Sequence, residues 1–361
     1  MARSRSTASP IAAREVAGRE VTGRDGDGWR ALPGTPVTGA DVAIGIDVGG
    51  GSIKLGLVTR AGAIIARRRL DHRHGAAGEA IVAGCAEAAA ALLSDRPGGR
   101  LCGIGVGFPG HLAADRGSGS MGNVPALDGL PVAALLGRRF GCPVRLINDA
   151  DAALMAEYRF GAGRGVRRLL LVALGTGIGV GFALDGVPVE TAGGCLGDAG
   201  HMIVVRHGAR RCRQGCLGCL ESVASGAAIE AQAGATRAPE GAGGATALLI
   251  GDALAGDPAA AAILTDAGRW IGMAAASWCN LFAPDRVLIG GGLSAAGALI
   301  LDAVRDEALG RAMPGNVAGT DFALAGLGND AGIVGAAAGL LFADAPGQGG
   351  GAATRDERGH A

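Results

Sequence analysis

The sequence has few aromatic residues, 3% of 361, so its core must be filled by Ala, Val, Leu and Ile. Lysine is nearly absent as well: Lys54 is the single lysine among 33 basic residues, and arginine carries the rest of the positive charge. The formal net charge is zero. A neutral chain gives no electrostatic reason to expect a nucleic-acid or membrane partner, and we predict neither.

Long apolar runs are missing too. No run reaches the roughly 20 residues that a membrane-spanning helix needs, and residues 1–40 lack the apolar centre of a signal peptide. The 8 cysteines therefore indicate free or metal-bound thiols in a reducing, cytoplasmic setting rather than disulfides. Residues 1–40 and 344–361 are rich in small and charged residues without periodicity, and we expect both segments to be disordered.

Glycine, by contrast, is abundant, with 68 residues, and two of its clusters stand in the same setting. Residues 169–174 form a short apolar run that predicts a buried strand, and a glycine turn at 175–177 follows it. The same pattern occurs earlier, with an apolar run at 42–47, glycines at 49–51 and a second run at 53–59. Such turns leave backbone N–H groups open to a phosphate. Two of them would hold a phosphate chain from both sides of a cleft, as in the actin-like, hexokinase-like ATPases.

The rest of the chain alternates apolar runs with Ala-rich stretches of helical period, which predicts an α/β protein. We expect a duplicated actin-like (ribonuclease-H-like) ATPase fold, with two domains and a cleft between them. A small domain at 41–147, completed by a helix at 331–343, precedes and packs beside a large domain at 148–330. A third glycine cluster, at 290–292, follows a predicted strand, where α/β sheets place ligands.

Eight motifs in a fixed order resemble the ROK family (repressors, open reading frames, kinases), which includes bacterial glucokinases and N-acetylmannosamine kinases. They are DVGGGSIK (47–54), FPG (108–110), NDADAALMAE (148–157), LGTGIGVG (174–181), DAGH (198–201), CRQGCLGCLE (212–221), APDRVLIGGGLS (283–294) and GNDAGIVGAA (328–337). The likeness runs from Val42 to Phe342. It implies a glucokinase-like enzyme that uses ATP and Mg²⁺ to phosphorylate the 6-hydroxyl of a hexose or aminohexose.

In this resemblance Asp149 is the general base that accepts the proton of the attacking hydroxyl. The alternative is structural, a helix N-cap. Asp198 stands where the family normally has Glu, and the shorter side chain would lose one contact or admit a substituent. None of the positions that the resemblance assigns to the sugar is an arginine, so a neutral or amino sugar is favoured over a sugar acid or phosphate. The residues implied to bind the sugar are Asn123, Asn148, Asp198, His201 and Glu221.

The resemblance also assigns a nucleotide site. Asp47 would face the metal and phosphates, with an Asx turn as the structural alternative. Gly51 stands where the family usually has Thr, so a phosphate-facing hydroxyl is either displaced to Ser52 or lost. The residues implied are Asp47, Gly49, Gly50, Gly51, Ser52, Lys54, Gly175, Thr176, Gly177, Gly290, Gly291 and Gly292. Retention of Lys54 fits a need for a compact ammonium, and it also fits chance.

A cysteine cluster departs from the zinc pattern of the family, Cys-x-Cys-x4-Cys with the histidine of the DAGH motif. Gln214 stands where the middle cysteine belongs, and Cys216 follows two positions later. Three thiolates and one imidazole, from Cys212, Cys216, Cys219 and His201, still make a tetrahedral Zn²⁺ set. We therefore predict a structural zinc; the alternative is a degenerate site with packed thiols.

Other functions stay open at this level. A ROK-type repressor would need a helix-turn-helix before the first hairpin, and residues 1–40 show no such pattern. A sugar-sensing regulator or pseudokinase without catalysis is motivated by Gly51 and Gln214. Polyphosphate in place of ATP is a further possibility for the donor. The resemblance makes a homodimer the expected assembly.

Overall fold

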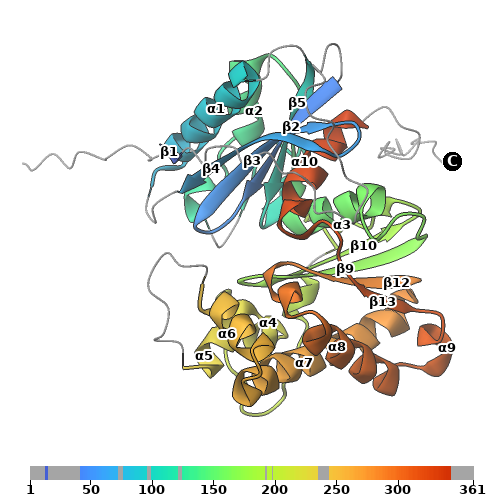
Figure 1. The fold of residues 1–361 in the computed structure, drawn as a ribbon. Helices are drawn as coiled ribbons and strands as arrows, with labels where there is room; N and C mark the ends of the chain where they lie inside the picture. Colours follow the sequence, from blue (N-terminus) through green and yellow to red (C-terminus); the bar gives the residue numbers. More distant parts are fainter. Residues whose placement is uncertain are drawn as a thin grey trace, which may run out of the picture.

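The computed structural model describes residues 13–14, 41–71, 76–95, 99–120, 124–191, 193–196, 198–234 and 244–342. Its strands form two main sheets, which Figure 1 shows one above the other. The segments expected to be disordered lie outside the described residues, apart from Ala13–Arg14. These two residues form strand β1, which pairs antiparallel with β4.

The first sheet has the strand order β1, β4, β3, β2, β5, β8. Strands β4, β3 and β2 form an antiparallel meander, and β5 and β8 run parallel to β2. The buried side chains of β2 are almost all aliphatic, as the apolar run predicts. The bounds are β2 Asp41–Val48, β3 Ser52–Thr59, β4 Ile64–Asp71, β5 Arg100–Phe108 and β8 Val144–Asn148.

The second sheet repeats this plan, with the order β11, β10, β9, β12, β13. Strands β9 and β10 pair antiparallel around the glycine turn, β11 adds to β10, and β12 and β13 run parallel to β9. The bounds are β9 Arg168–Leu174, β10 Ile178–Leu184, β11 Val187–Pro188, β12 Arg286–Gly290 and β13 Asp321–Leu324. The repeat confirms the predicted duplicated α/β fold. The sequence of residues 187–191 predicts a longer strand than β11, which ends at Pro188.

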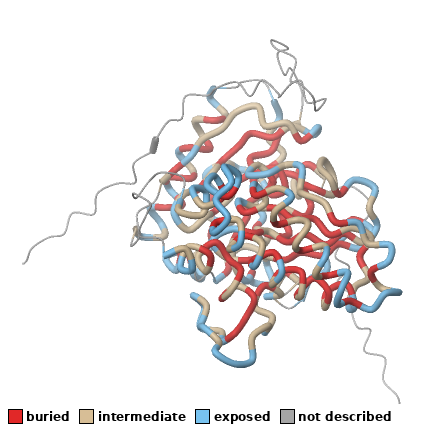
Figure 2. The backbone as a smooth tube through the Cα atoms, turned by 60° about the horizontal axis from the view of Figure 1, so that its bottom comes forward, coloured by how far each residue is buried: buried red, intermediate tan, exposed pale blue. Residues whose placement is uncertain are grey.

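Helices cover the sheets on both faces. Helices α1 and α2 pack on the outer face of the first sheet, and α6, α7 and α8 pack outside the second. Two further helices, α3 and α10, lie between the sheets and contact each other (Figure 1). Figure 2 shows buried chain running through the middle of the molecule. The bounds are α1 Gly78–Asp95, α2 Val132–Phe140, α3 Asp149–Phe160, α6 Gly244–Leu254, α7 Pro258–Phe282, α8 Ala298–Arg311 and α10 Ala331–Leu341.

The close approach of α10 to its neighbours explains part of the glycine content. A Cβ placed on Gly335 of α10 would lie 1.7 Å from the carbonyl oxygen of Ala152 on α3. A Cβ on Gly45 of β2 would lie 1.9 Å from the carbonyl oxygen of Ile333. No side chain fits at these points, so helix and strand backbones pack directly against each other.

Some elements differ from the pattern in the sequence. The sequence of residues 222–233 predicts one helix, but the structure has two, α4 (Glu221–Ala224) and α5 (Gly226–Gln232). Ser225 separates them because it adopts an extended backbone and caps α5 by accepting from the N–H of Ala228. A two-stranded ribbon of β6 (His111–Leu112) and β7 (Gly119–Ser120) was not expected. Among the described residues no single helix is long and apolar enough to cross a membrane; α6 and α7 would meet that measure only together, with a bend of 114° between them.

Candidate active site

A cavity of about 450 Å³ opens between the two sheets. Both glycine turns line it, and so do the first residues of α3 and of α10. The lining includes most of the residues predicted from the sequence: Asp47, Gly49, Gly50, Lys54, Asn148, Asp149, Gly175, Thr176, Gly177, Asp198, His201, Glu221, Gly290 and Gly291. Segments far apart in the sequence therefore meet in one place.

Asp149 begins α3 at the point where β8 ends. The cap of this helix is Asn148, whose side-chain oxygen accepts from the N–H groups of Ala150 (3.0 Å) and Asp151 (3.3 Å). The Asn148 amide also donates to the carbonyl oxygen of Gly110, at 3.2 Å, which fixes its orientation. Capping is thus performed by Asn148, and the Asp149 carboxylate is held at the cavity wall by one bond from the Ala150 N–H, at 2.8 Å.

The electrostatic setting of Asp149 suits a proton acceptor. Burial raises the pKa of its carboxyl group to about 6, and the negative charge of Asp47 adds to this shift. A base whose pKa lies near neutral pH combines a deprotonated form with a useful proton affinity. The residue can therefore take a proton from a hydroxyl group that enters the cavity.

The first glycine turn places an ion pair at the edge of the cavity. Asp47 and Lys54 are directly opposite each other in the β2–β3 ladder, and the Lys54 Nζ lies 3.5 Å from the Asp47 Oδ2. Behind Asp47 the helix α10 comes so close that a Cβ on Gly332 would lie 2.8 Å from the Asp47 carboxyl carbon. The carboxylate is therefore confined to the cavity side, where a cation can reach it.

The carboxylate of Glu221 packs against the second glycine turn. The Glu221 Oε2 accepts from the N–H of Ile178 at 3.1 Å, and a Cβ on Gly177 would lie 2.4 Å from the same oxygen. The Glu221 Oε2 also lies 4.0 Å from the His201 Nε2. Glycine at 177 is thus required for the carboxylate to approach the turn.

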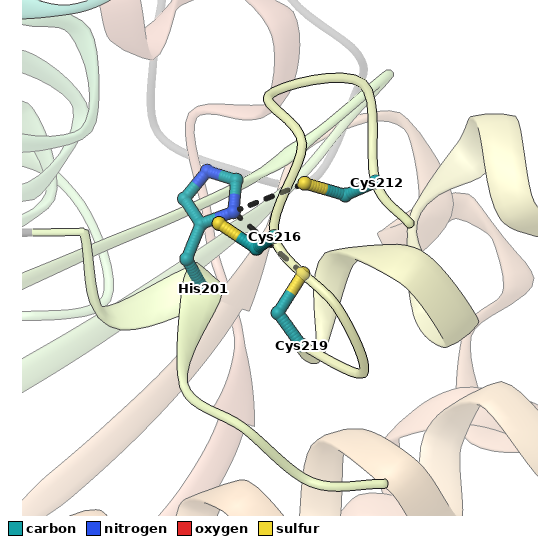
Figure 3. A group of neighbouring side chains, drawn as sticks. All are labelled: His201, Cys212, Cys216 and Cys219. Atoms are coloured by element: carbon teal, nitrogen blue, oxygen red, sulfur yellow. Dashed lines mark hydrogen bonds between the residues drawn. The ribbon is translucent and has the colours of Figure 1, made fainter. Parts of the chain in front are cut away.

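Four side chains beside this cavity form a compact cluster, drawn in Figure 3. The ligand atoms of His201, Cys212, Cys216 and Cys219 all lie within 4.8 Å of one another. The His201 Nδ1 is 3.6 Å from the Cys212 Sγ and 3.7 Å from the Cys219 Sγ. Such spacing fits a tetrahedral ion with bonds of about 2.0–2.3 Å.

The same cluster orients the imidazole ring of His201. Because Nδ1 of His201 faces the sulfur atoms, the Nε2 is left toward Glu221 and the cavity. Gln214, which replaces the expected cysteine, lines the cavity as well. Burial raises the pKa of the Cys219 thiol to about 11, so a metal bound there must displace a proton.

His111 is a contact that the sequence did not reveal. Its Nε2 lies 2.9 Å from the Asp198 Oδ2, and the two side chains are both about half exposed. The histidine stands on β6, directly after the FPG loop, whereas Asp198 belongs to the segment that leads to His201. The pair therefore connects the segment after the FPG loop to the segment before His201; of the two residues, Asp198 lines the cavity and His111 does not.

Not every predicted residue lines the cavity. Gly51 and Gly292 lie outside the lining, and so does Ser52 at the start of β3. Asn123 falls outside the described residues. In return the lining includes Gly328 and Asn329, which stand in the motif at 328–337 but had no role assigned to them.

Comparison with known proteins shows the family to which the chain belongs. The model of the ROK family matches residues 43–342. A glucokinase of Halalkalibacterium halodurans is 33% identical over 305 residues, covering 81% of this chain and 92% of the relative. The solved structure of a ROK family glucokinase from Streptomyces griseus, in complex with glucose and AMPPNP, has a TM-score of 0.69 and 31% identity, covering 82% and 98% of the two chains.

The family also contains regulators. The DNA-binding transcriptional repressor Mlc of Escherichia coli is 31% identical over 224 residues, covering 60% of this chain and 54% of the repressor. The fold is that of the two-domain actin-like sugar kinases. The chain belongs to the ROK family, which confirms the resemblance predicted from its motifs.

Proposed function

We propose that this protein is an ATP-dependent sugar kinase that phosphorylates the 6-hydroxyl of a neutral hexose, such as glucose, or of an aminohexose. The observation that carries the proposal is Asp149, a carboxylate with a pKa of about 6 at the wall of a cavity between two glycine turns. In phosphoryl transfer, positioning and charge stabilisation do most of the work, and a carboxylate that accepts the hydroxyl proton orients the attack.

The donor side of the cavity is assigned to the glycine turns. The glycine turns at 49–51 and 175–177 would hold the phosphates, and Gly290 and Gly291 would lie against the nucleoside. The candidate donors are the N–H groups of Gly50, Thr176 and Gly177, because those of Gly49 and Gly175 already donate to the carbonyl oxygens of Ser52 (3.0 Å) and Gly177 (2.9 Å). Asp47 and the phosphates of ATP would hold Mg²⁺, and its positive charge would stabilise the phosphoryl group during transfer. Lys54 supplies a second positive charge at the same edge.

The acceptor side is assigned to Asn148, Asp198, His201 and Glu221, together with Asn123. Carboxylates accept hydrogen bonds from two hydroxyl groups, so they suit a polyol. Of the described residues that line the cavity, none is an arginine and Lys54 is the only lysine. A sugar that already carries a phosphate or a carboxylate would therefore find no free cation there.

We further propose that His201, Cys212, Cys216 and Cys219 bind a structural Zn²⁺ that holds the His201 ring toward the sugar. Purified protein should then contain about one zinc per chain. Cys216→Ser should lose the metal and lower the melting temperature, because binding of structural zinc is coupled to folding. Cys142→Ser, which removes a thiol outside the cluster, should keep both. Metal-free protein with full activity would contradict the assignment.

The kinase assignment is tested by incubating the protein and Mg²⁺ with either ATP or polyphosphate and one of glucose, glucosamine, kanosamine, N-acetylmannosamine and fructose. The position of the phosphate is then found by NMR. We expect transfer to C6 of glucose or of a glucose-configured aminosugar. Preference for an acidic or phosphorylated sugar, or transfer to C1, would contradict the proposal.

A sugar-sensing regulator is the second candidate, because the family includes the repressor Mlc. Binding of a sugar without transfer from any donor would favour it. Cytoplasmic location and a homodimeric state stay predictions; light scattering of the full chain would measure the second.

A further inference from the structure

A second cavity, of about 430 Å³, lies on the other side of α3. Ala153 and Glu157 of α3 line the first cavity, whereas Met155 and Arg159 line the second. Residues two apart in a helix point about 200° from each other. The second cavity is therefore on the face of α3 turned away from Asp47 and the glycine turns.

Both halves of the molecule, one built on the first sheet and the other on the second, contribute to this second cavity. The turn after β6, strand β8 and helix α10 line it from one side, and β11 with Glu190 lines it from the other. Arg116 of the first half forms an ion pair with Glu190 of the second. An occupant would thus touch both halves at their junction.

The charges that line the second cavity are not balanced. Arg116 is neutralised by Glu190, and the Asp115 carboxylate, at the exposed rim, accepts from the N–H of Gly117 at 2.9 Å. Two more cations, Arg145 and Arg159, also line the cavity. Among the described residues neither has a carboxylate partner. The positive charge therefore exceeds the negative charge.

Arg159 is held in an unusual position for a cation. Its guanidinium carbon lies 4.4 Å from the centre of the Phe342 ring, and its buried Nε has no hydrogen-bond partner among the described residues. Burial lowers the pKa of this side chain. The buried Nε is closed to a ligand, but Arg159 also lines the cavity without a carboxylate partner, and a bound anion would offset its charge.

The remaining wall is apolar, with Leu146, Ile147, Met155, Val187 and Leu340 among the lining residues. The volume falls in the range of small-molecule sites. We propose that this cavity binds a small organic anion, a phosphate or carboxylate with an apolar body, through Arg145 and Arg159. The anionic group would lie between the two guanidinium groups and the body against the aliphatic wall.

Calorimetric titration of the full chain tests this with three probes that share a ring: phenyl phosphate, benzoate and neutral benzyl alcohol. We expect at least one anion to bind and the alcohol not to bind, and the stronger anion identifies the group that the cavity prefers. Loss of a charge-assisted hydrogen bond should weaken that binding about tenfold or more in Arg145→Gln and in Arg159→Gln.

Arg145 is exposed, so its variant should fold even if Arg159→Gln does not. Arg164→Gln is the matched control, because Arg164 is also exposed and lies outside both cavities. Its affinity should equal that of the unmodified protein. Binding of neither anion, or equal affinity in Arg145→Gln, would overturn the proposal.

Discussion

Two buried carboxylates on α3 show how differently one helix can treat the same chemical group. Glu157 is fully buried, and its oxygens accept from the N–H groups of Ala162 (2.8 Å), Gly326 (3.0 Å) and Leu327 (2.7 Å). Asp151 is 1% exposed, and neither of its oxygens has a hydrogen-bond partner among the described residues. Hydrogen bonds to Glu157 hold two loops against α3, whereas the burial of Asp151 costs free energy that no hydrogen bond offsets.

A third carboxylate, Asp149, completes the comparison. It has one backbone donor and faces the cavity, and burial raises its pKa to about 6. For Asp151 burial raises the pKa to about 8, with Glu190 and Asp149 adding to the shift. The three acids stand within nine positions of sequence, so their surroundings, and not their chemistry, decide their roles. Replacing each by its amide should separate those roles.

The largest effect is expected for Asp149→Asn. Loss of the base should lower turnover by about 10²–10⁴, with sugar affinity and fold retained. Steady-state kinetics with the preferred sugar measures this. Asp151→Asn is the control, because it makes the same replacement two residues further on and should keep turnover within the normal range. Near-normal turnover of Asp149→Asn would remove Asp149 from the mechanism.

Asp151→Asn should instead raise stability, and more so at higher pH. The pKa of Asp151 is about 8 in the folded state and 3.8 for an unperturbed aspartate, so the unfolded chain ionises first as the pH rises. The folded state therefore loses stability from about pH 4 upward, and the loss stops growing above about pH 8. The amide does not titrate. Urea unfolding should show the advantage of the variant growing by on the order of 3 kcal/mol between pH 5 and pH 8; a constant difference would contradict this account.

Glu157→Gln should have the opposite sign. An amide presents only one acceptor oxygen, so at least one of the N–H groups of Ala162, Gly326 and Leu327 would face another donor. We expect a loss of about 1–3 kcal/mol in the free energy of unfolding, with little dependence on pH. The measurement is the same urea titration. A stabilising effect would mean that the comparison of the two buried acids is wrong.

The smallest effect is expected in the pH dependence of kcat/KM of the unmodified protein. If Asp149 must be deprotonated to accept a proton, kcat/KM should fall as the pH drops below about 6, approaching a tenfold decrease for each pH unit. The profile should not change in Asp151→Asn, since Asp151, with a pKa of about 8, is protonated and uncharged in the pH range where Asp149 titrates. A flat profile between pH 5 and pH 8 would speak against Asp149 as the base.

Much of the fold was predictable because glycine turns and apolar runs are local patterns. The strand predicted at 169–174 and the helix predicted at 331–343 appear as β9 and α10, within one or two residues of those bounds, and the strand predicted before the glycines at 290–292 appears as β12. Most of the residues that the motifs assign to the site line one cavity. These positions depend on short-range signals, an apolar run followed by a glycine turn or an Ala-rich stretch of helical period.

What the sequence did not reveal depends on distant partners. The contact of His111 with Asp198 joins residues 87 positions apart, and no periodic pattern in the sequence predicts it. Nor could the motif NDADAALMAE distinguish its acids, because the donors to Glu157 come from residues 326 and 327. The break at Ser225 likewise follows from a single capped turn rather than from helix propensity.

The direct packing of α10 has a consequence for the order in which the protein can fold during synthesis. The inner face of the first sheet, with Ala43 and Val58, is covered by Ile333, Ala337 and Leu341. A ribosome makes the strands of that sheet roughly 200 residues before it makes α10. Until then the sheet is left with an uncovered apolar face, and a nascent chain released early would lack both its cover and one wall of the cleft.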